Sequence, residues 1–387
     1  MFTDLAPLDA ARTLASPFSA RAREAERACT MPADLVADVR RAGLFNLTTP
    51  RILGGLELPP QQTVEVIEEV SRADGSAGWT ILIGNATGFL AWLDPHVAAQ
   101  LLAARTDTVA AGVFAPMGRF TDTAPGTFRL DGRWGFASGS PHADWFWGGG
   151  FVLDGPGPRI VPGHGPDWRL GIVPTSAVTI VETWDCAGLR GTGSHDVVVD
   201  AVPVPHEHTI APFREPARHD GPLWRLPFFT FVGTQMVGFP LGVARRALDE
   251  LTAIATAKAR PPSPLPIGHD GDVQIAITRA EAALQSARAL VVDALGGVWE
   301  SALAGNVPDV HRRARFLLAT QNAMRTAVEV VTAAVGLGGT AGMHADHPLQ
   351  RCLRDIHAAD QHIYFSQAAS KRYAMTRLGI EQDTSWF

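Results

Sequence analysis

The sequence predicts a mainly α-helical protein with a central β-barrel, and three observations support this fold class. Residues 1–105 are rich in Ala and place apolar residues at helical spacing. Between 106 and 215 Gly, Pro, Thr and Val become frequent, and the apolar pattern shortens to alternating runs. Residues 216–387 return to long amphipathic segments. We therefore expect an N-terminal helical domain (1–105), a β-barrel domain (106–215) and a C-terminal helical bundle (216–387).

The N-terminal domain is expected to consist of amphipathic helices separated by polar turns. Leu35 and Val39 share one face of such a helix, and Asp74-Gly75-Ser76 interrupts a later one. Asn85 follows in an apolar helical stretch, where a buried amide needs hydrogen-bond partners. Two roles stay open for Asn85: a helix-packing residue bonded to backbone, or a contact to substrate or peroxide.

The middle of the chain is expected to form a small barrel or sandwich. Turn signals such as Asp131-Gly132 and the run 154–157 separate short stretches of alternating apolar residues. Many short strands with regular turns are typical of such all-β units.

Four long segments predict a helical bundle in the C-terminal domain. They cover 237–258, 272–304, 309–337 and 347–366. On the last segment Asp355, Ala359 and His362 fall at i, i+4 and i+7, so they are expected to share a helix face. A His beside small residues can exchange protons near neutral pH, although most His residues on long helices are surface or core-edge residues.

Composition argues against several classes of function. The net charge of -6 and the pI of about 6.1 do not provide the basic surface that nucleic-acid binding requires. Cys29, Cys186 and Cys352 are widely spaced and form no CxxC pair, which argues against a zinc site or a disulfide framework and fits a reducing cytoplasm. Neither a signal peptide nor a membrane-spanning apolar run is apparent, so we expect a cytoplasmic protein with no membrane partner.

The C-terminal motifs resemble those of a known family. The run 338–342 (GGTAG), then His347-Pro348, then Arg354-Asp355, is similar to the C-terminal signature of the acyl-CoA dehydrogenase superfamily. In its dehydrogenases a common form of the signature places a catalytic Glu nine residues after the arginine. Here that position is Ile363, which cannot remove a proton. His362 instead stands where the two-component flavin-dependent monooxygenases of the superfamily carry their catalytic His.

Two segments of the middle domain resemble the flavin-facing segments of that branch. They are 114–118 (FAPMG) and 132–145 (GRWGFASGSPHADW). The resemblance implies that Phe114 lies at the flavin, that Phe136 forms an apolar wall, and that Ser138 bonds the N5/O4 edge of the ring. Because Ser138 follows Phe136 by two residues, we expect both on one side of a strand. Without the resemblance, an ordinary strand serine among core aromatics is the better interpretation.

Further flavin contacts are implied on the same basis. The run 184–196 resembles a family loop, through which Trp184 and Thr192 would line the site. Arg260 stands where the family has an arginine that can meet a flavin phosphate. Gly338 and Gly339 would approach the phosphate end, and they also suit the C-cap of a helix.

The resemblance implies a mechanism and a set of partners. The protein would be an oxygenase component that receives reduced FMN, or reduced FAD, from a separate NAD(P)H:flavin reductase. A flavin C4a-(hydro)peroxide formed with O2 would hydroxylate a small aromatic substrate, with His362, Ser138 and Asn85 as catalytic residues. His362 is expected to act as a base or hydrogen-bond partner with a pKa near neutral. A homotetramer is also implied. No GxGxxG nicotinamide fingerprint follows a strand, which fits reduction of the flavin by another protein.

Three alternatives remain open. The first is an acyl-CoA dehydrogenase with a displaced base, such as Glu250 or Glu329. The second is a flavin N-oxygenase acting on an amino sugar. The third is a non-catalytic member that has lost its flavin. Aromatic residues are candidates for a substrate pocket, although each one alone is more readily a core residue; they are Phe89, Trp92, Phe228, Phe229 and Phe231.

Overall fold

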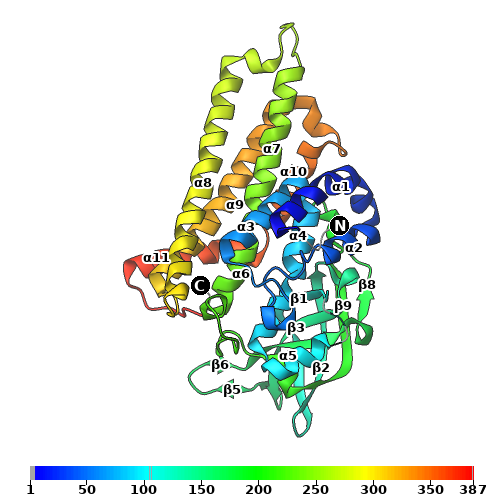
Figure 1. Cartoon of the computed structure of the whole chain (residues 1–387), viewed down its shortest axis with the longest axis vertical. Coiled ribbons are helices and arrows are strands. Elements are labelled where there is room, and N and C mark those ends of the chain that lie inside the picture. The colour runs from blue at the N-terminus through cyan, green and yellow to red at the C-terminus, as the bar shows by residue number, and fades with distance from the viewer. Residues whose placement is uncertain (1–4, 104, 106, 386) are drawn as a thin grey trace.

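The computed structural model describes residues 5–103, 105, 107–385 and 387, and its elements follow one another as helices, sheet and helices (Figure 1). The N-terminal helices are α1 (Pro7–Ala28), α2 (Ala33–Arg41), α3 (Pro60–Ala73), α4 (Gly75–Gly84) and α5 (Pro95–Leu102). The C-terminal helices are α6 (Phe228–Met236), α7 (Gly238–Ala257), α8 (Gly271–Leu303), α9 (Val310–Gly338), α10 (Pro348–Ala359) and α11 (Gln367–Leu378).

The predicted helix starts agree with the capping chemistry that the structure contains. Asp74 ends α3 and begins α4, because its side chain accepts a hydrogen bond from the Ala77 N–H at 2.9 Å. His347 caps α10 in the same way, with Pro348 at the first helical position. The turn expected at Asp74-Gly75-Ser76 is therefore the junction of two helices.

The middle of the chain forms an eight-stranded mixed sheet and a separate two-stranded hairpin. The strands are β1 (Ala110–Ala124), β2 (Thr127–Ala137), β3 (Trp145–Asp154), β4 (Gly157–Pro158), β5 (Ile160–Val161), β6 (Gly165–Pro166), β7 (Trp168–Pro174), β8 (Thr179–Val181), β9 (His195–Pro205) and β10 (Thr209–Ile210). The order is β10-β7-β3-β1-β2-β9-β8, with β4 paired to β3. β1 and β3 are parallel, and the other pairs of this sheet are antiparallel.

The structure shows a central mixed sheet in the region where the sequence predicts a β-barrel, and closure of that sheet into a barrel stays a prediction. Within the described residues the end strands β10 and β8 share no ladder, so the pairing that we observe follows an open path. β1 also departs from regular pairing between Val113 and Gly118, where its register against β3 shifts. The segment between these two residues, which includes Phe114, bulges away from the ladder.

Trp134 organises the core of the sheet. Its side chain is completely buried and donates its indole N–H to the Gly149 carbonyl at 2.9 Å. Three glycines surround the ring, and a Cβ at Gly118, Gly132 or Gly148 would lie only 2.5–2.8 Å from it. The glycine-rich composition of these strands therefore makes room for one large aromatic side chain.

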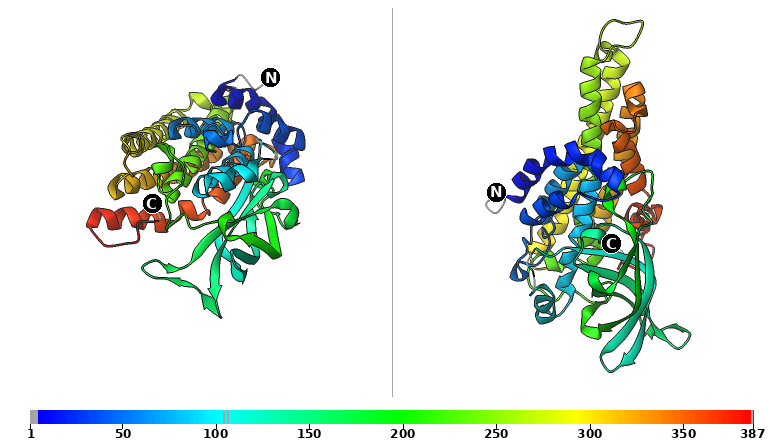
Figure 2. Two further views of the ribbon diagram at one scale, coloured as in Figure 1. Left: turned by 60° about the horizontal axis from the view of Figure 1, so that its bottom comes forward. Right: turned by 90° about the vertical axis from the view of Figure 1, so that its right-hand side faces the viewer.

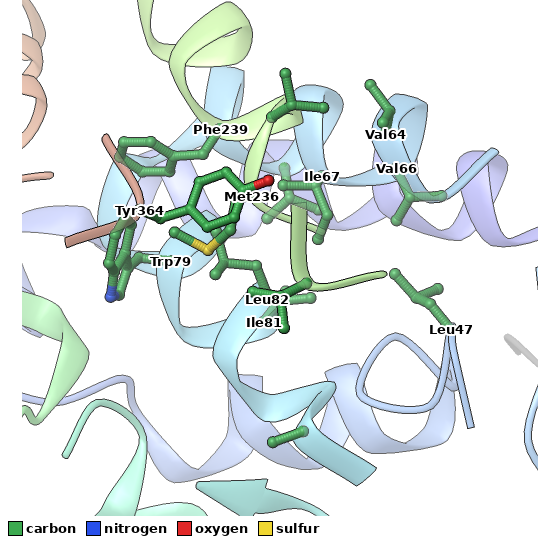
Figure 3. Close-up of a cluster of buried hydrophobic side chains, with 14 of the residues drawn as sticks. Leu47, Val64, Val66, Ile67, Trp79, Ile81, Leu82, Met236, Phe239 and Tyr364 are labelled. Carbon is green, nitrogen blue, oxygen red and sulfur yellow. The ribbon is translucent and has the colours of Figure 1, made fainter. Parts of the chain in front are cut away.

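The bundle consists of α7, α8, α9 and α10, with α11 packed against α9. α3 packs on α7 through Gly238 and Gly242, whose absent side chains let the two backbones approach closely. A single large apolar core joins the N-terminal helices to this bundle, and a smaller core lies within the sheet. Figure 3 shows the part of the large core where Trp79, Met236, Phe239 and Tyr364 meet.

The described residues contain one helical segment, 310–343, that is long and apolar enough to cross a membrane by length and composition. In this structure the segment is α9 and the turn after it, and it packs against α7, α8, α10 and α11. Its apolar face is therefore explained by the bundle. Cys29, Cys186 and Cys352 are free thiols.

The contact between α3 and α7 gives a matched test of packing. A Cβ at Gly242 would lie 2.2 Å from the Glu68 carbonyl oxygen, whereas a Cβ at Gly296 in α8 meets nothing within 4 Å. We expect Gly242→Ala to lower the free energy of unfolding by about 1–3 kcal/mol. Gly296→Ala should raise it by about 0.5–1 kcal/mol, because Ala restricts the unfolded chain and favours helix. Urea unfolding of both variants measures these changes, and equal effects would contradict the packing shown here.

Candidate active site

His362 lies just beyond the end of α10 rather than on it. The helix ends at Ala359, and His362 begins a short 3-10 helix, η10 (Ile363–Phe365). The expectation that Asp355, Ala359 and His362 share one helix face is therefore wrong. The helix stops because the next residues form tighter turns, with the His362 N–H bonded to the Ala359 carbonyl at 2.9 Å.

The hydrogen bonds of His362 define its protonation. Its Nδ1 accepts the Tyr364 N–H at 3.2 Å, so in the neutral ring the proton sits on Nε2. Burial lowers the pKa of His362 to about 4, which corrects the expectation of a pKa near neutral. At neutral pH the imidazole is therefore uncharged and presents Nε2–H as a hydrogen-bond donor.

Trp79 connects His362 to Ser138. The indole ring stands edge-on to the imidazole, with 5.4 Å between ring centroids and an interplanar angle of 76°. Its Nε1–H donates to the Ser138 hydroxyl at 3.1 Å. On its other side Trp79 packs edge-on against Phe239, 5.1 Å away, as Figure 3 shows. A helix of the N-terminal domain thus places one indole between the two residues that sequence patterns single out.

Ser138 belongs to a row of three buried hydroxyls, which we call the hydroxyl row: Ser138, Ser194 and Thr192. The Oγ atoms of Ser138 and Ser194 are 2.7 Å apart, and the Ser194 Oγ is 2.6 Å from the Thr192 Oγ1. Thr192 donates to the Leu189 carbonyl at 2.7 Å. Thr192 is therefore buried behind Ser138 as a support, and its predicted direct role at a flavin stays a prediction.

Phe136 and Trp184 form an aromatic corner beside this row. Their ring centroids are 6.0 Å apart at an interplanar angle of 81°, and 74% of Phe136 is exposed. Phe136 has a φ of 62°, and Ser138 lies beyond the end of β2, so strand alternation does not put the two residues on one face. Ser138 is only 6% exposed, in contrast to Phe136.

His195 holds Trp184 in place, and the sequence patterns did not single it out. Its Nδ1 faces the N–H groups of both Thr183 and Trp184, at 3.2 Å each. The Trp184 indole N–H donates to the Leu189 carbonyl at 3.0 Å. The exposed aromatic corner is therefore fixed at its backbone and at its indole nitrogen.

Asn85 is fully occupied with backbone groups. Its Oδ1 accepts the Leu47 N–H at 2.7 Å, and its Nδ2 donates to the Leu44 and Ile81 carbonyls, each at 2.8 Å. The side chain is buried, and it ties the end of α4 to the loop after α2. This geometry agrees with the first of the two roles left open for Asn85.

Phe114 lies in an aromatic cluster rather than at the aromatic corner. Its ring centroid is 5.4 Å from those of Phe89 and Phe228. The candidate pocket residues Phe89, Trp92, Phe228, Phe229 and Phe231 are all buried and contact one another or other aromatic rings. They are core residues in this structure. Phe229 packs against Tyr364, whose backbone N–H donates to His362.

Arg260, Gly338 and Gly339 form a second group, away from the first. Arg260 donates to the Leu337 carbonyl at 3.0 Å, and a Cβ at Gly339 would lie 3.6 Å from its guanidinium. The loop between α7 and α8 that carries Arg260 is at the top of Figure 1 and of the right-hand view of Figure 2, far from the sheet. The 20 residues of α7 separate the two groups, which corresponds to roughly 30 Å.

The alternative bases are engaged elsewhere. Glu250 pairs with Arg246 at 2.8 Å on α7, and Glu329 pairs with Arg325 at 2.8 Å on α9. Each pair is the i, i+4 type that stabilises a helix surface. Neither carboxylate contacts His362, Trp79 or Ser138, as far as the described residues show.

Trp79, Ser194 and His195 are the site residues that sequence reasoning missed. Ser194 and His195 lie near the end of the run 184–196, of which the family resemblance pointed only to Trp184 and Thr192. The alternation of Thr192 and Ser194 around Gly193 was an available signal, because two hydroxyls so close can bond each other. Trp79 gave no signal beyond an aromatic residue in an apolar helix.

The low pKa of His362 predicts a pH effect on stability. Burial disfavours the charged His362 ring in the folded state. The free energy of unfolding is therefore highest above the unfolded pKa of about 6.5 and decreases as pH falls toward 4. Gln does not titrate, so His362→Gln is the reference. Relative to it, the free energy of unfolding of the wild type should fall by up to about 3 kcal/mol between pH 6.5 and 4. Urea unfolding of both proteins across this range measures the difference, and a constant difference would contradict burial of a neutral His362.

Comparison with known proteins shows the family to which the chain belongs. The "Acyl-CoA dehydrogenase, N-terminal domain" family matches residues 6–94, and the "Acyl-CoA dehydrogenase, C-terminal domain" family matches residues 235–367. An indole-3-acetate monooxygenase from Pseudomonas putida is 35% identical over 349 residues, which are 89% of this chain and 86% of that protein. The oxygenase component of an FADH2-dependent resorcinol hydroxylase from a Rhizobium species is 27% identical over 391 residues, covering 95% of this chain and 93% of that protein.

Solved structures share the fold over almost the full length. The 3-HSA hydroxylase from Rhodococcus sp. RHA1 superposes with a TM-score of 0.90 at 24% identity, covering 100% of both chains. A complex of TdsC from Paenibacillus sp. A11-2 with FMN and indole gives a TM-score of 0.82 at 21% identity, covering 98% of this chain and 100% of that one. From the sequence matches, the chain belongs to the flavin-dependent monooxygenase branch of the acyl-CoA dehydrogenase superfamily.

Proposed function

We propose that this protein is the oxygenase component of a two-component flavin monooxygenase that hydroxylates a small aromatic substrate. One observation carries the proposal: the segment after α10 presents a neutral imidazole, linked through Trp79 to Ser138, and no carboxylate contacts these three residues in the described part of the chain. A dehydrogenase of this fold needs a base to remove a carbon-bound proton. A neutral imidazole with its proton on Nε2 is suited to donate a hydrogen bond instead.

The exposed residues fit a flat aromatic cofactor. The exposed Phe136 and the half-buried Trp184 offer ring surfaces, and the buried Ser138 near them offers a hydroxyl oxygen. We assign reduced flavin, FMN or FAD, to this place, where it would supply the electrons that activate O2. The protein's own residues would hold the ring, exclude water and orient the substrate.

His362 is assigned the role of hydrogen-bond donor to the oxygen at the reacting centre. Its Nδ1 is held by the Tyr364 N–H, so the ring cannot exchange tautomers without losing that bond. The Nε2 atom has no hydrogen-bond partner among the described residues and remains available. A preorganised donor at a site of developing negative charge stabilises the transition state. Asn85 is assigned a structural role, because backbone groups occupy its amide.

The substrate is proposed to be a small aromatic ring system such as an indole or a phenol. The printed names of two relatives, which act on indole-3-acetate and resorcinol, support this class. Tyr364 and Phe229, whose ring centroids lie 4.7 Å apart, are buried core residues behind His362 and make its surroundings apolar, which suits such a ligand. Phe365 adds a further ring 6.4 Å from His362.

A second copy of the chain is proposed to complete the flavin site. Arg260, Gly338 and Gly339, which suit a phosphate, lie roughly 30 Å from the aromatic corner and cannot serve the same flavin within one chain. Contacts from a neighbouring subunit would resolve this separation, which supports the homotetramer expected from the family. A separate NAD(P)H:flavin reductase and a cytoplasmic location complete the proposal.

Substitution of His362 distinguishes a donor from a base. With reduced FMN, O2 and indole-3-acetate as probes, His362→Ala should lower product formation roughly 100-fold. His362→Gln keeps an N–H donor and should recover part of that loss, to within about tenfold of wild type. Product is measured by chromatography in single turnovers.

The matched control is His357→Ala, since His357 is exposed on α10 and should leave the rate unchanged. Equal losses for the Gln and Ala variants would favour a base, and a wild-type rate for His362→Ala would remove His362 from the reaction. Failure of wild type to hydroxylate a panel of indoles and phenols, while it oxidises an acyl-CoA with an artificial acceptor, would reject the proposed function.

A further inference from the structure

The hydroxyl row contains three short oxygen–oxygen contacts that share three hydroxyl protons. Ser138 is 2.7 Å from Ser194, Ser194 is 2.6 Å from Thr192, and Thr192 is 2.7 Å from the Leu189 carbonyl oxygen. Two oxygens at such distances repel each other unless a proton lies between them. Each contact therefore requires one proton, and each hydroxyl brings only one.

This count sets the direction of every bond in the row. The Leu189 carbonyl brings no proton, so the Thr192 proton must fill the last contact. The Ser194 proton then fills the contact with Thr192, and the Ser138 proton fills the contact with Ser194. The carbonyl is held in place by two further donors, the Trp184 indole N–H and the Thr192 backbone N–H. The Leu189 carbonyl is therefore a fixed acceptor, and it sets the direction of every hydrogen bond in the hydroxyl row.

The consequence falls on Ser138. Its proton is committed to Ser194, and one of its lone pairs accepts the Trp79 indole N–H at 3.1 Å. One lone pair is left, so Ser138 can accept a hydrogen bond from a ligand but cannot donate one. Oxidised isoalloxazine carries an unprotonated N5, which is an acceptor, whereas the reduced ring carries N5–H, which is a donor.

We propose that Ser194 and Thr192 are positioning residues that hold Ser138 as a hydrogen-bond acceptor, so that the site discriminates in favour of reduced flavin. This inference rests on the proposed function, which places the flavin edge at Ser138. The protein would then select the redox state of its cofactor through the direction of a hydroxyl row, with no charged group required. Release of the oxidised ring follows from the same arrangement, because two acceptors would face each other.

The test compares the dissociation constants of reduced and oxidised FMN, measured anaerobically and aerobically by titration calorimetry. Wild type should bind reduced FMN more tightly. In Ser194→Ala the Ser138 proton becomes free to point at oxidised N5, so the preference for reduced FMN should shrink roughly tenfold, mainly through tighter binding of oxidised FMN. Thr192→Val should act in the same direction, because it frees the Ser194 proton and lets the Ser138–Ser194 bond reverse.

Ser140→Ala is the matched control. Ser140 is also buried and lies two residues after Ser138, but its hydroxyl donates to the Gly193 carbonyl and does not join the row. In Ser140→Ala the ratio of the dissociation constants of oxidised and reduced FMN should equal that of wild type. A purely structural role for the row would weaken both redox forms equally in the variants. An unchanged ratio in both Ser194→Ala and Thr192→Val overturns the inference.

The outcomes also separate this inference from the proposed function. A wild type that binds both forms equally contradicts the inference and leaves the oxygenase proposal standing. A wild type that binds neither form, while remaining folded by circular dichroism, contradicts the proposed function itself. Should Ser194→Ala not fold, the Thr192→Val comparison with Ser140→Ala decides the question alone.

Discussion

The candidate site depends on one contact between the sheet and the bundle, in which the Leu189 N–H donates to the Asp355 carboxylate at 2.6 Å. The backbone beside it is tightly packed, because a Cβ at Gly188 would lie 2.0 Å from the Arg354 carbonyl oxygen. The Leu189 carbonyl in turn anchors the Trp184 indole and the hydroxyl row. The Leu189 backbone therefore helps to position the aromatic corner and Ser138 relative to the segment that carries His362, in addition to the contacts that Trp79 makes with His362 and Ser138.

Several ionisable side chains are buried around the contact between Leu189 and Asp355. Asp355, Asp74 and Glu26 are buried together with Arg351, which lies 3.1 Å from Glu26 and 3.5 Å from Asp74. Burial, with Asp74 as the next cause, raises the pKa of Asp355 to about 7. Among the residues that the structure describes, the second Asp355 oxygen has no hydrogen-bond partner, and it faces Gly75 at the start of α4. The buried cluster thus ties α1, α4 and α10 together beside the candidate site.

How much of this was accessible from the sequence differs from element to element. The order of helices, sheet and helices followed from periodicity, and the interruption at Asp74-Gly75-Ser76 followed from its turn residues, whereas the capping role of Asp74 came from the structure. The end of α10 was missed, because the apolar spacing continues past Ala359 to Ile363, whereas the backbone there forms tighter turns. The contact of Trp79 with Ser138 joins residues 59 positions apart, and local patterns carry no information on such pairs. The low pKa of His362 likewise arises from burial, which a helical wheel does not show.

The positive φ of Phe136 has a consequence for the evolution of this protein. A bulky residue in the left-handed region costs on the order of 1–2 kcal/mol relative to Gly. The exposed Phe136 ring gains little from burial to offset that cost. Directed evolution toward heat resistance alone should therefore enrich Gly at position 136. The resulting proteins would be more stable, but they would lack one wall of the proposed cofactor site.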